Sequence, residues 1–217
     1  MIKKQNYLKH AIVLFLLLLL MQPERAWAAY ENVEFSSLTN HDGLTNSQVG
    51  AILKDTRGYI WFGTQSGLCR FDGFRMKTFY YSNTDDKSLP NNSVDELQQD
   101  YDGNIWVHTS VGYSIYKYDE EQFERKPEEW LKNIHVQGPP YKLLIDKDKN
   151  MWIAVYGQGL YYHNAKTRNT YLFKFTKKAQ PGCLKEGNIS KITEVDGDAL
   201  ITYADGTICR VNGQKQK

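Results

Sequence analysis

The sequence predicts an all-β fold of β-propeller blades: about three complete four-stranded antiparallel blades plus a partial fourth, forming an incomplete propeller. The first observation behind this prediction is a repeat. The segment "GYIWFGTQSGLCRFDG" around Trp61 recurs as "GNIWVHTSVGYSIYKYD" around Trp106 and as "KNMWIAVYGQGLYYHN" around Trp152. A weaker copy, "GDALITYADGTICRVNG", has Leu200 in the tryptophan position. A period of about 45 residues is typical of propeller blades.

The second observation is the hydrophobic pattern around each tryptophan, which is apolar at consecutive positions, as in "YIWF" and "IWV". Successive side chains of a strand point to opposite faces, so both faces of this strand must be buried. An antiparallel sheet with one face in water would alternate instead. Radially stacked blades bury both faces; a linear stack of sheets is the alternative. The predicted repeat core is Trp61, Trp106, Trp152 and Leu200.

Turn residues separate the short strands of each repeat. In the first repeat we expect strands at 49–54, 59–64, 68–71 and 75–81. Glycine supplies the positive φ that tight hairpins need, and aspartate caps turns through nearby backbone N–H groups. The predicted turn residues are Asp55, Gly58, Gly67, Asp100, Gly103, Gly112, Asp146, Gly159 and Gly206. The segment "KPEEWLKN", residues 126–133, is expected to form one or two helical turns, with Trp130 packed on the propeller.

The N-terminal segment has the order of a secretory signal peptide: lysines, an apolar run and then "AWAA". The apolar run is too short to span a bilayer, although an uncleaved anchor is the alternative. We therefore predict a signal peptide at 1–28 and propeller repeats at 29–217, and a periplasmic location. The blades are expected near 45–81, 90–125, 140–176 and, in part, 188–213.

Composition excludes several classes of function. Removing the signal peptide takes away four basic residues and one acidic residue, which leaves the mature chain close to neutral. Nucleic-acid binding, which needs a clustered positive face, is therefore not expected. The three cysteines, Cys69, Cys183 and Cys209, lack metal-ligand spacing. Cys69 is expected to be a buried strand residue, and export leaves a disulfide between two of the three permitted.

No catalytic motif stands out. The sequence contains no nucleophile motif, no phosphate-binding glycine loop and no histidine pair at ligand spacing, so we predict no catalytic residues, no metal and no cofactor. Ligand-binding residues are not identified. The mature chain has four histidines, His41, His108, His135 and His163. His108 is expected to line a blade surface or a channel, and His41 is expected to be exposed to solvent.

Two functional interpretations of the repeat residues compete with structural ones. Asp55, Asp100 and Asp146 could suggest calcium, but they recur once per blade and would lie far apart, which favours turn capping. The tryptophans could stack on sugar rings. Their position at strand centres favours packing between blades.

The first repeat carries a family resemblance. The segment "LTNHDGLTNSQVGAILKDTRGYIWFGTQSGLCRFDG" resembles the two-component regulator propeller family in its "DGLTN" lead-in, its "IWFGT" strand and its "RFDG" turn. The resemblance extends over most of the mature chain but weakens in the fourth repeat. It implies the exported sensor portion of a bacterial hybrid two-component histidine kinase. Full-length relatives carry two propellers, a β-sandwich, a membrane span and a kinase.

The leading hypothesis is a ligand-sensing propeller module of a periplasmic sensor, which recognises a polysaccharide-derived oligosaccharide and is a fragment lacking the kinase. The alternatives are an exported propeller enzyme acting on polysaccharide and an inactive truncated product. Expected partners are further blades and kinase-bearing segments. The outer faces of the first and last blades, with Ile60, Phe62 and Leu200, also suggest a homodimer unless a strand at 33–39 closes the ring.

The signal peptide leads to a testable prediction. Expression in a Gram-negative host should give a periplasmic product whose N-terminus, read by mass spectrometry, is Ala29 or Tyr30, because the cleavage site follows "AWA" or "AWAA". Recovery of the intact Met1 form from the cytoplasm would contradict it.

Overall fold

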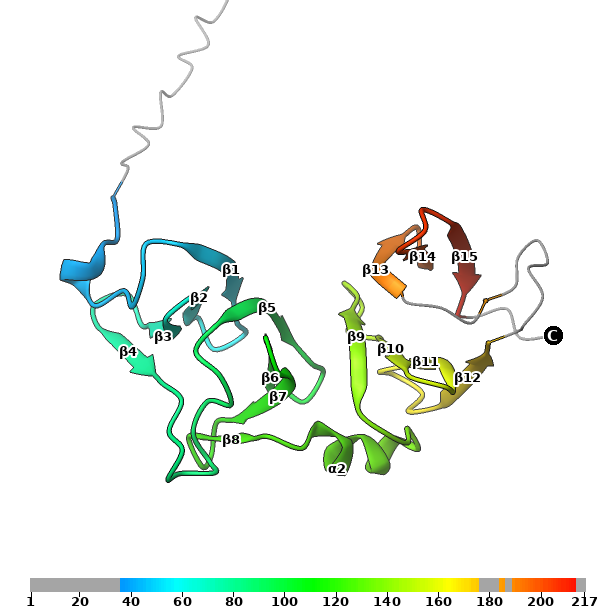
Figure 1. Ribbon diagram of the computed structural model, residues 1–217, viewed down its shortest axis with the longest axis horizontal. Coiled ribbons are helices and arrows are strands. Elements are labelled where there is room, and N and C mark those ends of the chain that lie inside the picture. The colour runs from blue at the N-terminus through cyan, green and yellow to red at the C-terminus, as the bar shows by residue number, and fades with distance from the viewer. Residues whose placement is uncertain (1–35, 176–183, 186–188, 214–217) are drawn as a thin grey trace, which may run out of the picture. The chain divides into compact units, whose positions relative to one another are not determined.

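Four antiparallel sheets follow one another along the chain (Figure 1). A computed structural model describes residues 36–175, 184–185 and 189–213. The chain divides into two units, Met1–Ser37 and Leu38–Lys217, and every described strand lies in the second. The signal-peptide segment lies outside the described residues.

Each sheet is a meander, which we number as a blade in chain order. The bounds are as follows: blade 1 has β1 (Val49–Lys54), β2 (Ile60–Thr64), β3 (Gly67–Phe71) and β4 (Met76–Phe79); blade 2 has β5 (Val94–Gln99), β6 (Ile105–Thr109), β7 (Gly112–Lys117) and β8 (Gln122–Glu124); blade 3 has β9 (Pro140–Ile145), β10 (Met151–Val155), β11 (Gly159–His163) and β12 (Thr170–Lys174); blade 4 has β13 (Ile189–Val195), β14 (Asp198–Tyr203) and β15 (Ile208–Asn212).

The predicted fold class is therefore confirmed: three four-stranded sheets and a fourth of three strands. The strand bounds of blade 1 agree with the prediction except at some ends, where β2 begins at Ile60 and β4 is shorter at both ends. The short helices are η1 (Asn40–Asp42), α2 (Pro127–Leu131) and η2 (Lys132–Ile134). The last two form the helical connection predicted between blades 2 and 3.

The expected N-terminal strand at 33–39 is wrong for its described part. Residues 36–39 are not in a strand. Thr39 instead begins η1 with a capping box, because its hydroxyl accepts from the His41 N–H and the Asp42 carboxylate accepts from the Thr39 N–H. Residues 33–35 lie outside the described part of the chain.

The core of the described residues consists of three hydrophobic clusters, and each lies between consecutive blades. The tryptophan of β2 packs with blade 2, that of β6 with α2 and blade 3, and that of β10 with blade 4. Trp61, for example, lies 5.1 Å from the Tyr116 ring in an edge-on contact, and Trp106 lies 5.4 Å from Trp130. The tryptophan of each blade thus reaches towards the blade that follows it.

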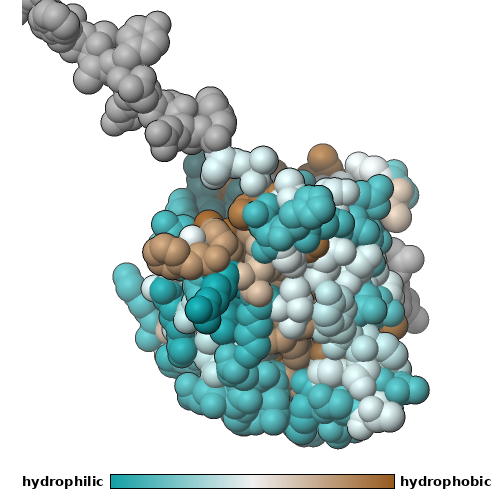
Figure 2. Space-filling view, turned by 90° about the vertical axis from the view of Figure 1, so that its left-hand side faces the viewer, coloured by the Kyte–Doolittle hydropathy of each residue, from teal (hydrophilic) through white to brown (hydrophobic). Residues whose placement is uncertain are grey.

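Burial of the second strands follows from this stacking. All five residues of β10 are buried, as expected for a strand between two sheets. In β2, Ile60 and Phe62 are only half-buried, because the described residues contain no sheet before blade 1. Figure 2 shows brown, hydrophobic surface between teal and white residues on this side of the molecule. Leu200 is also half-buried, since it points away from blade 3.

The tryptophan contacts lead to a stability prediction. Trp106→Ala should lower the free energy of unfolding by about 3–5 kcal/mol, because it removes a fully buried ring between two blades. Chemical denaturation with far-UV detection would measure this loss. Phe74→Ala is the control, since Phe74 is 94% exposed and should change little. An equal midpoint for Trp106→Ala and the native chain would show that this ring is not part of the core.

Candidate functional site

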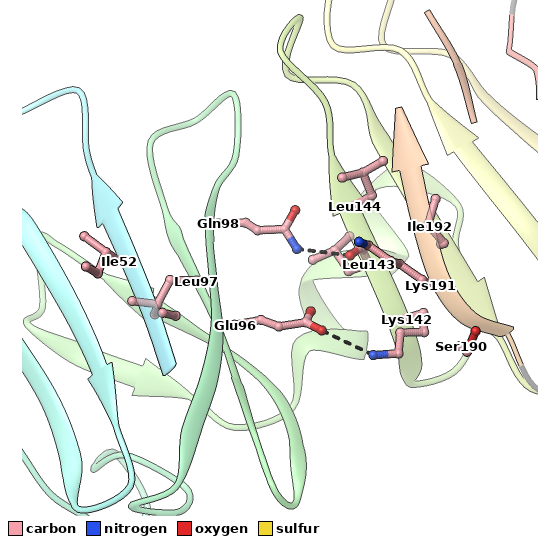
Figure 3. A pocket seen from close by; sticks show the side chains of 11 residues that line it. Ile52, Glu96, Leu97, Gln98, Lys142, Leu143, Leu144, Ser190, Lys191 and Ile192 are labelled. Carbon is pink, nitrogen blue, oxygen red and sulfur yellow. Dashed lines mark hydrogen bonds and ion pairs between the residues drawn. The ribbon is translucent and has the colours of Figure 1, made fainter. Parts of the chain in front are cut away.

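A pocket of about 320 Å³ opens where the first strands of the four blades converge (Figure 3). These strands, β1, β5, β9 and β13, contact one another in chain order. The lining residues are Ala51 and Ile52 from β1, Glu96 to Gln98 from β5, Lys142 to Leu144 from β9, and Ser190 to Ile192 from β13. The pocket therefore has lining residues from all four blades.

The polar lining residues occupy one repeated position. Each first strand has a register shift near its start, followed by the same pairing with its second strand. By this register Glu96, Lys142 and Lys191 are equivalent to one another and to Ala51 of blade 1. The propeller repeat therefore places one carboxylate and two ammonium groups around the pocket at the same level.

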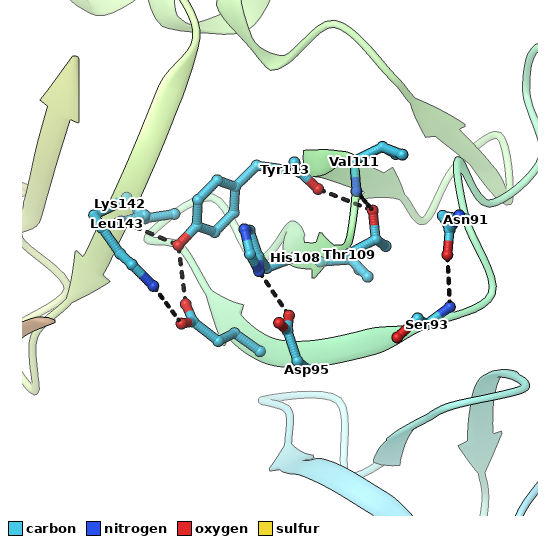
Figure 4. Close-up of polar contacts among 12 residues, drawn as sticks. Asn91, Ser93, Asp95, His108, Thr109, Val111, Tyr113, Lys142 and Leu143 are labelled. Carbon is cyan, nitrogen blue, oxygen red and sulfur yellow. Dashed lines mark hydrogen bonds and ion pairs between the residues drawn. The ribbon is translucent and has the colours of Figure 1, made fainter. Parts of the chain in front are cut away.

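Glu96 is the centre of the polar contacts. One carboxylate oxygen lies 3.2 Å from Lys142 Nζ, and the other accepts a 2.9 Å hydrogen bond from the Tyr113 hydroxyl (Figure 4). The Tyr113 oxygen in turn accepts from the Leu143 N–H at 3.1 Å. Burial, followed by the charge of Glu96, raises the pKa of Tyr113 well above its ordinary value. The hydroxyl therefore remains a donor, and it fixes Glu96 in place.

Gln98 joins blade 2 to blade 3 through the free edge of β9. Its Nε2 donates to the Leu143 carbonyl at 3.0 Å, and its Oε1 accepts from the Ile145 N–H at 2.6 Å. The side-chain amide thus completes backbone hydrogen bonds that no strand of blade 3 supplies on this side. Figure 3 shows Glu96 and Gln98 extending from β5 towards β9.

A second polar pair lies beside this network. His108 Nδ1 is 2.6 Å from the Asp95 carboxylate, and the His108 ring lies 4.4 Å from the Tyr113 ring. The side chain of His108 is only 18% exposed, whereas that of Asp95 is 53% exposed. His108 therefore lies on a blade surface, where it supports Tyr113.

The pocket can bind a polar ligand. It offers an amide, a hydroxyl and both signs of charge, above an aliphatic lining of Ile52, Leu97 and Ile192. Lys142 is paired with Glu96, while Lys191 has no ion pair among the described residues. The lining thus has one net positive charge, which favours an anionic group on a ligand.

The three predicted core tryptophans lie apart from this pocket, between the blades. Trp61, Trp106 and Trp152 are at most 1% exposed. Leu200 pairs with Thr193 and Arg210 in the register that each tryptophan has in its own blade, but it is half-buried.

The predicted turn residues adopt the conformations that tight turns require. Gly58, Gly67, Gly103, Gly112, Gly159 and Gly206 all have positive φ. Asp55, Asp100 and Asp146 are buried, and each accepts backbone N–H groups two and four residues later in its turn. Burial raises the pKa of Asp100.

The aspartates also reach the core tryptophans. The indole Nε1 of Trp61 donates to Asp55 at 2.7 Å, and that of Trp106 donates to Asp100 at 2.9 Å. Blade 3 differs: Asp146 accepts from the Asn150 side chain, and Trp152 Nε1 has no hydrogen-bond partner among the described residues. The aspartates therefore serve the packing, and Asp55 also accepts a hydrogen bond from the Tyr118 hydroxyl of blade 2.

The remaining sequence candidates are dispersed. His41 and His135 are exposed, and His163 is buried in β11. No group of three or more metal-ligating side chains occurs among the described residues. Cys69 has a free thiol and is fully buried, Cys209 is half-buried in β15, and Cys183 lies outside the described residues. None of the helices in the described part is long and apolar enough to cross a bilayer.

Residues 43–66 and 88–110 match the family model described as two-component regulator propeller. These segments include β1 with β2 and β5 with β6, and of these strands β1 and β5 line the pocket. These two segments therefore have the sequence of two-component regulator propeller repeats. Over 61 residues, 28% of the chain, it is 41% identical to Histidine kinase P4 of Formosa agariphila, but this segment is 4% of that protein's length.

Solved structures with propeller repeats share the fold. The extracellular domain of a hybrid two-component system from B. thetaiotaomicron matches 82% of this chain with a TM-score of 0.59 at 24% identity. The extracellular domain of a one-component system from the same organism matches 78% with a TM-score of 0.51 at 17% identity. This chain spans 25% and 24% of those two domains.

The Gln98 bridge leads to a prediction about the pocket's own stability. Gln98→Met should lower the free energy of unfolding by about 1–3 kcal/mol, because it leaves the Leu143 carbonyl and the Ile145 N–H without their partner. Gln48→Met is the control, since the Gln48 side chain is exposed. Equal urea midpoints for the two variants would show that the bridge contributes nothing.

Proposed function

We propose that the chain is the ligand-sensing propeller module of a periplasmic two-component sensor and that it recognises a polysaccharide-derived oligosaccharide without catalysing a reaction. The observation that carries the proposal is the pair of two-component regulator propeller repeats, whose first strands line the four-blade pocket. The similarity to extracellular domains of such systems supports an exported location.

The pocket is the proposed ligand site. Sugar hydroxyls donate and accept hydrogen bonds, and the pocket supplies both kinds of partner in Glu96, Lys142 and Lys191. The net positive charge favours an oligosaccharide with a carboxylate or sulfate over a neutral one. Ligand contacts to Glu96 or Lys142 would compete with the contact that joins blade 2 to blade 3. A sensor needs such a differential contact between two states.

Calorimetric titration tests the site with two probes, oligogalacturonides and neutral xylo-oligosaccharides. The acidic probe should bind more tightly, and Lys191→Met should weaken that binding about three- to tenfold by removing a charge that makes no ion pair with the described residues. Lys54→Met is the matched control, an exposed lysine of β1 outside the pocket lining. Absence of binding by both probes, or an equal loss in Lys54→Met, would contradict this site.

A further inference from the structure

A second pocket, of about 350 Å³, lies between blades 2 and 3 and shares no residue with the first. Three segments form it: the β5–β6 turn with Tyr101 and Asp102, the helical connection with Trp130 and Asn133, and the β11–β12 hairpin with His163 and Arg168. It thus combines two aromatic rings with an imidazole, an amide and two charged groups.

His163 departs from the residue type that the other four-stranded blades have at the same strand position. It pairs with Met151 at the β11 position that Phe71 and Tyr116 occupy in their own blades. Those blades carry a phenyl and a phenol ring there, whereas blade 3 has an imidazole, with two ring nitrogens, that is 1% exposed. A polar group at a position that the repeat reserves for packing marks a functional candidate.

The hydrogen bonds of His163 define its tautomer. Its Nδ1 lies 2.8 Å from Thr170 Oγ1, and that hydroxyl donates its own hydrogen to the Ile134 carbonyl at 2.6 Å. Nδ1 must therefore carry the ring hydrogen and donate to Thr170. This leaves Nε2 as a bare acceptor, and it is buried without a partner among the described residues.

The surroundings keep this acceptor neutral. Burial lowers the pKa of His163, and the nearby Arg168 charge lowers it further. At neutral pH the ring is therefore uncharged, and its Nε2 can only accept a hydrogen bond. A buried acceptor left unpaired is costly, so the site gains most from a ligand that brings a donor.

Aromatic rings and Arg168 form the rest of the pocket. The Tyr101 ring lies 5.3 Å from the His163 ring and 6.1 Å from Trp130. The Arg168 guanidinium lies 3.9 Å from the Tyr101 ring centre and 3.4 Å from the Asp102 carboxylate. Arg168 has a φ of 59°, a left-handed conformation that is uncommon for residues other than glycine.

We propose that this pocket binds a neutral ring compound with several hydroxyl groups. One hydroxyl donates to His163 Nε2, and an apolar face of the ring packs on Tyr101 or Trp130. The positive charge of Arg168 disfavours cationic donors, and Asn133, Asp102 and Arg168 are available to further hydroxyls. Nε2 is covered in this conformation, so the proposal requires a side chain of the pocket to move as the ligand enters, and Arg168, which is 56% exposed, is the side chain we expect to move.

The test uses the mature chain and NMR of its histidine side-chain nitrogens. Methyl β-glucoside, methyl β-galactoside and myo-inositol are the probes, and tetramethylammonium, which has no hydrogen-bond donor, is the control. At least one neutral probe should shift the His163 Nε2 resonance and the Trp130 indole resonance in a saturable way. If none of the three shifts them, or if tetramethylammonium does so equally, the proposal is overturned.

Two variants isolate the acceptor. His163→Asn keeps a polar group at the Nδ1 position but has nothing at Nε2, whereas His163→Gln keeps an amide oxygen near the Nε2 position. Binding should weaken about tenfold in His163→Asn and much less in His163→Gln. Unweakened binding by folded His163→Asn would overturn the assignment.

The pH dependence of ligand affinity in the native chain tests the proposal without relying on a variant that folds. Protonation converts Nε2 from an acceptor to a donor, so affinity should fall as the pH falls through the lowered pKa of His163. A pH-independent affinity would overturn it. Lys191 lies in the other pocket, so Lys191→Met should leave binding at the His163 pocket unchanged. This variant therefore distinguishes a failure of the His163 proposal from a failure of the proposed sensor site.

Discussion

The packing of each second-strand tryptophan onto the following blade is the interaction on which this structure depends. Trp61, Trp106 and Trp152 each enter a cluster that contains residues of two consecutive sheets. A single four-stranded sheet cannot bury both faces of its own second strand, so the blades gain stability mainly from their neighbours. The aspartate turns contribute to the same contact in blades 1 and 2, because their carboxylates also accept the indole N–H.

The pocket between the first strands is a consequence of this stacking. When the sheets stack through their second strands, their first strands converge with free backbone edges. Such edges need partners or protection. In blade 3 the partners are side chains from blade 2: the Gln98 amide contacts both Leu143 and Ile145, and the Tyr113 hydroxyl contacts Leu143. Gln98 and Leu143, which join the two blades, also line the pocket, so a change in the pocket lining at these residues would also change the contact between the blades.

The fold could be predicted from the sequence because its signals are local and repeated. The period, the doubly apolar strand around Trp106 and the turn glycines all depend on the same stacked sheet, so each supports the others. The pocket could not be predicted in this way. Glu96, Lys142 and Lys191 lie in first strands whose sequences differ from repeat to repeat, and only the strand register shows that they are equivalent. Extending the repeat alignment from the tryptophans to these strands would have revealed charged residues at one position.

The departures from the repeat explain where function can reside. Positions between blades are constrained by packing, so an aromatic residue such as Tyr116 recurs there in similar form. A polar residue at such a position needs a compensating partner, and among the described residues His163 has one for Nδ1 but none for Nε2. First-strand positions that face the pocket are under no such constraint, and blade 1 has Ala51 where blade 2 has Glu96. Residues that pack between blades therefore vary little from repeat to repeat. Residues of the pocket lining and of the junction between blades 2 and 3 vary more, and these are the positions where polar groups that can contact a ligand occur.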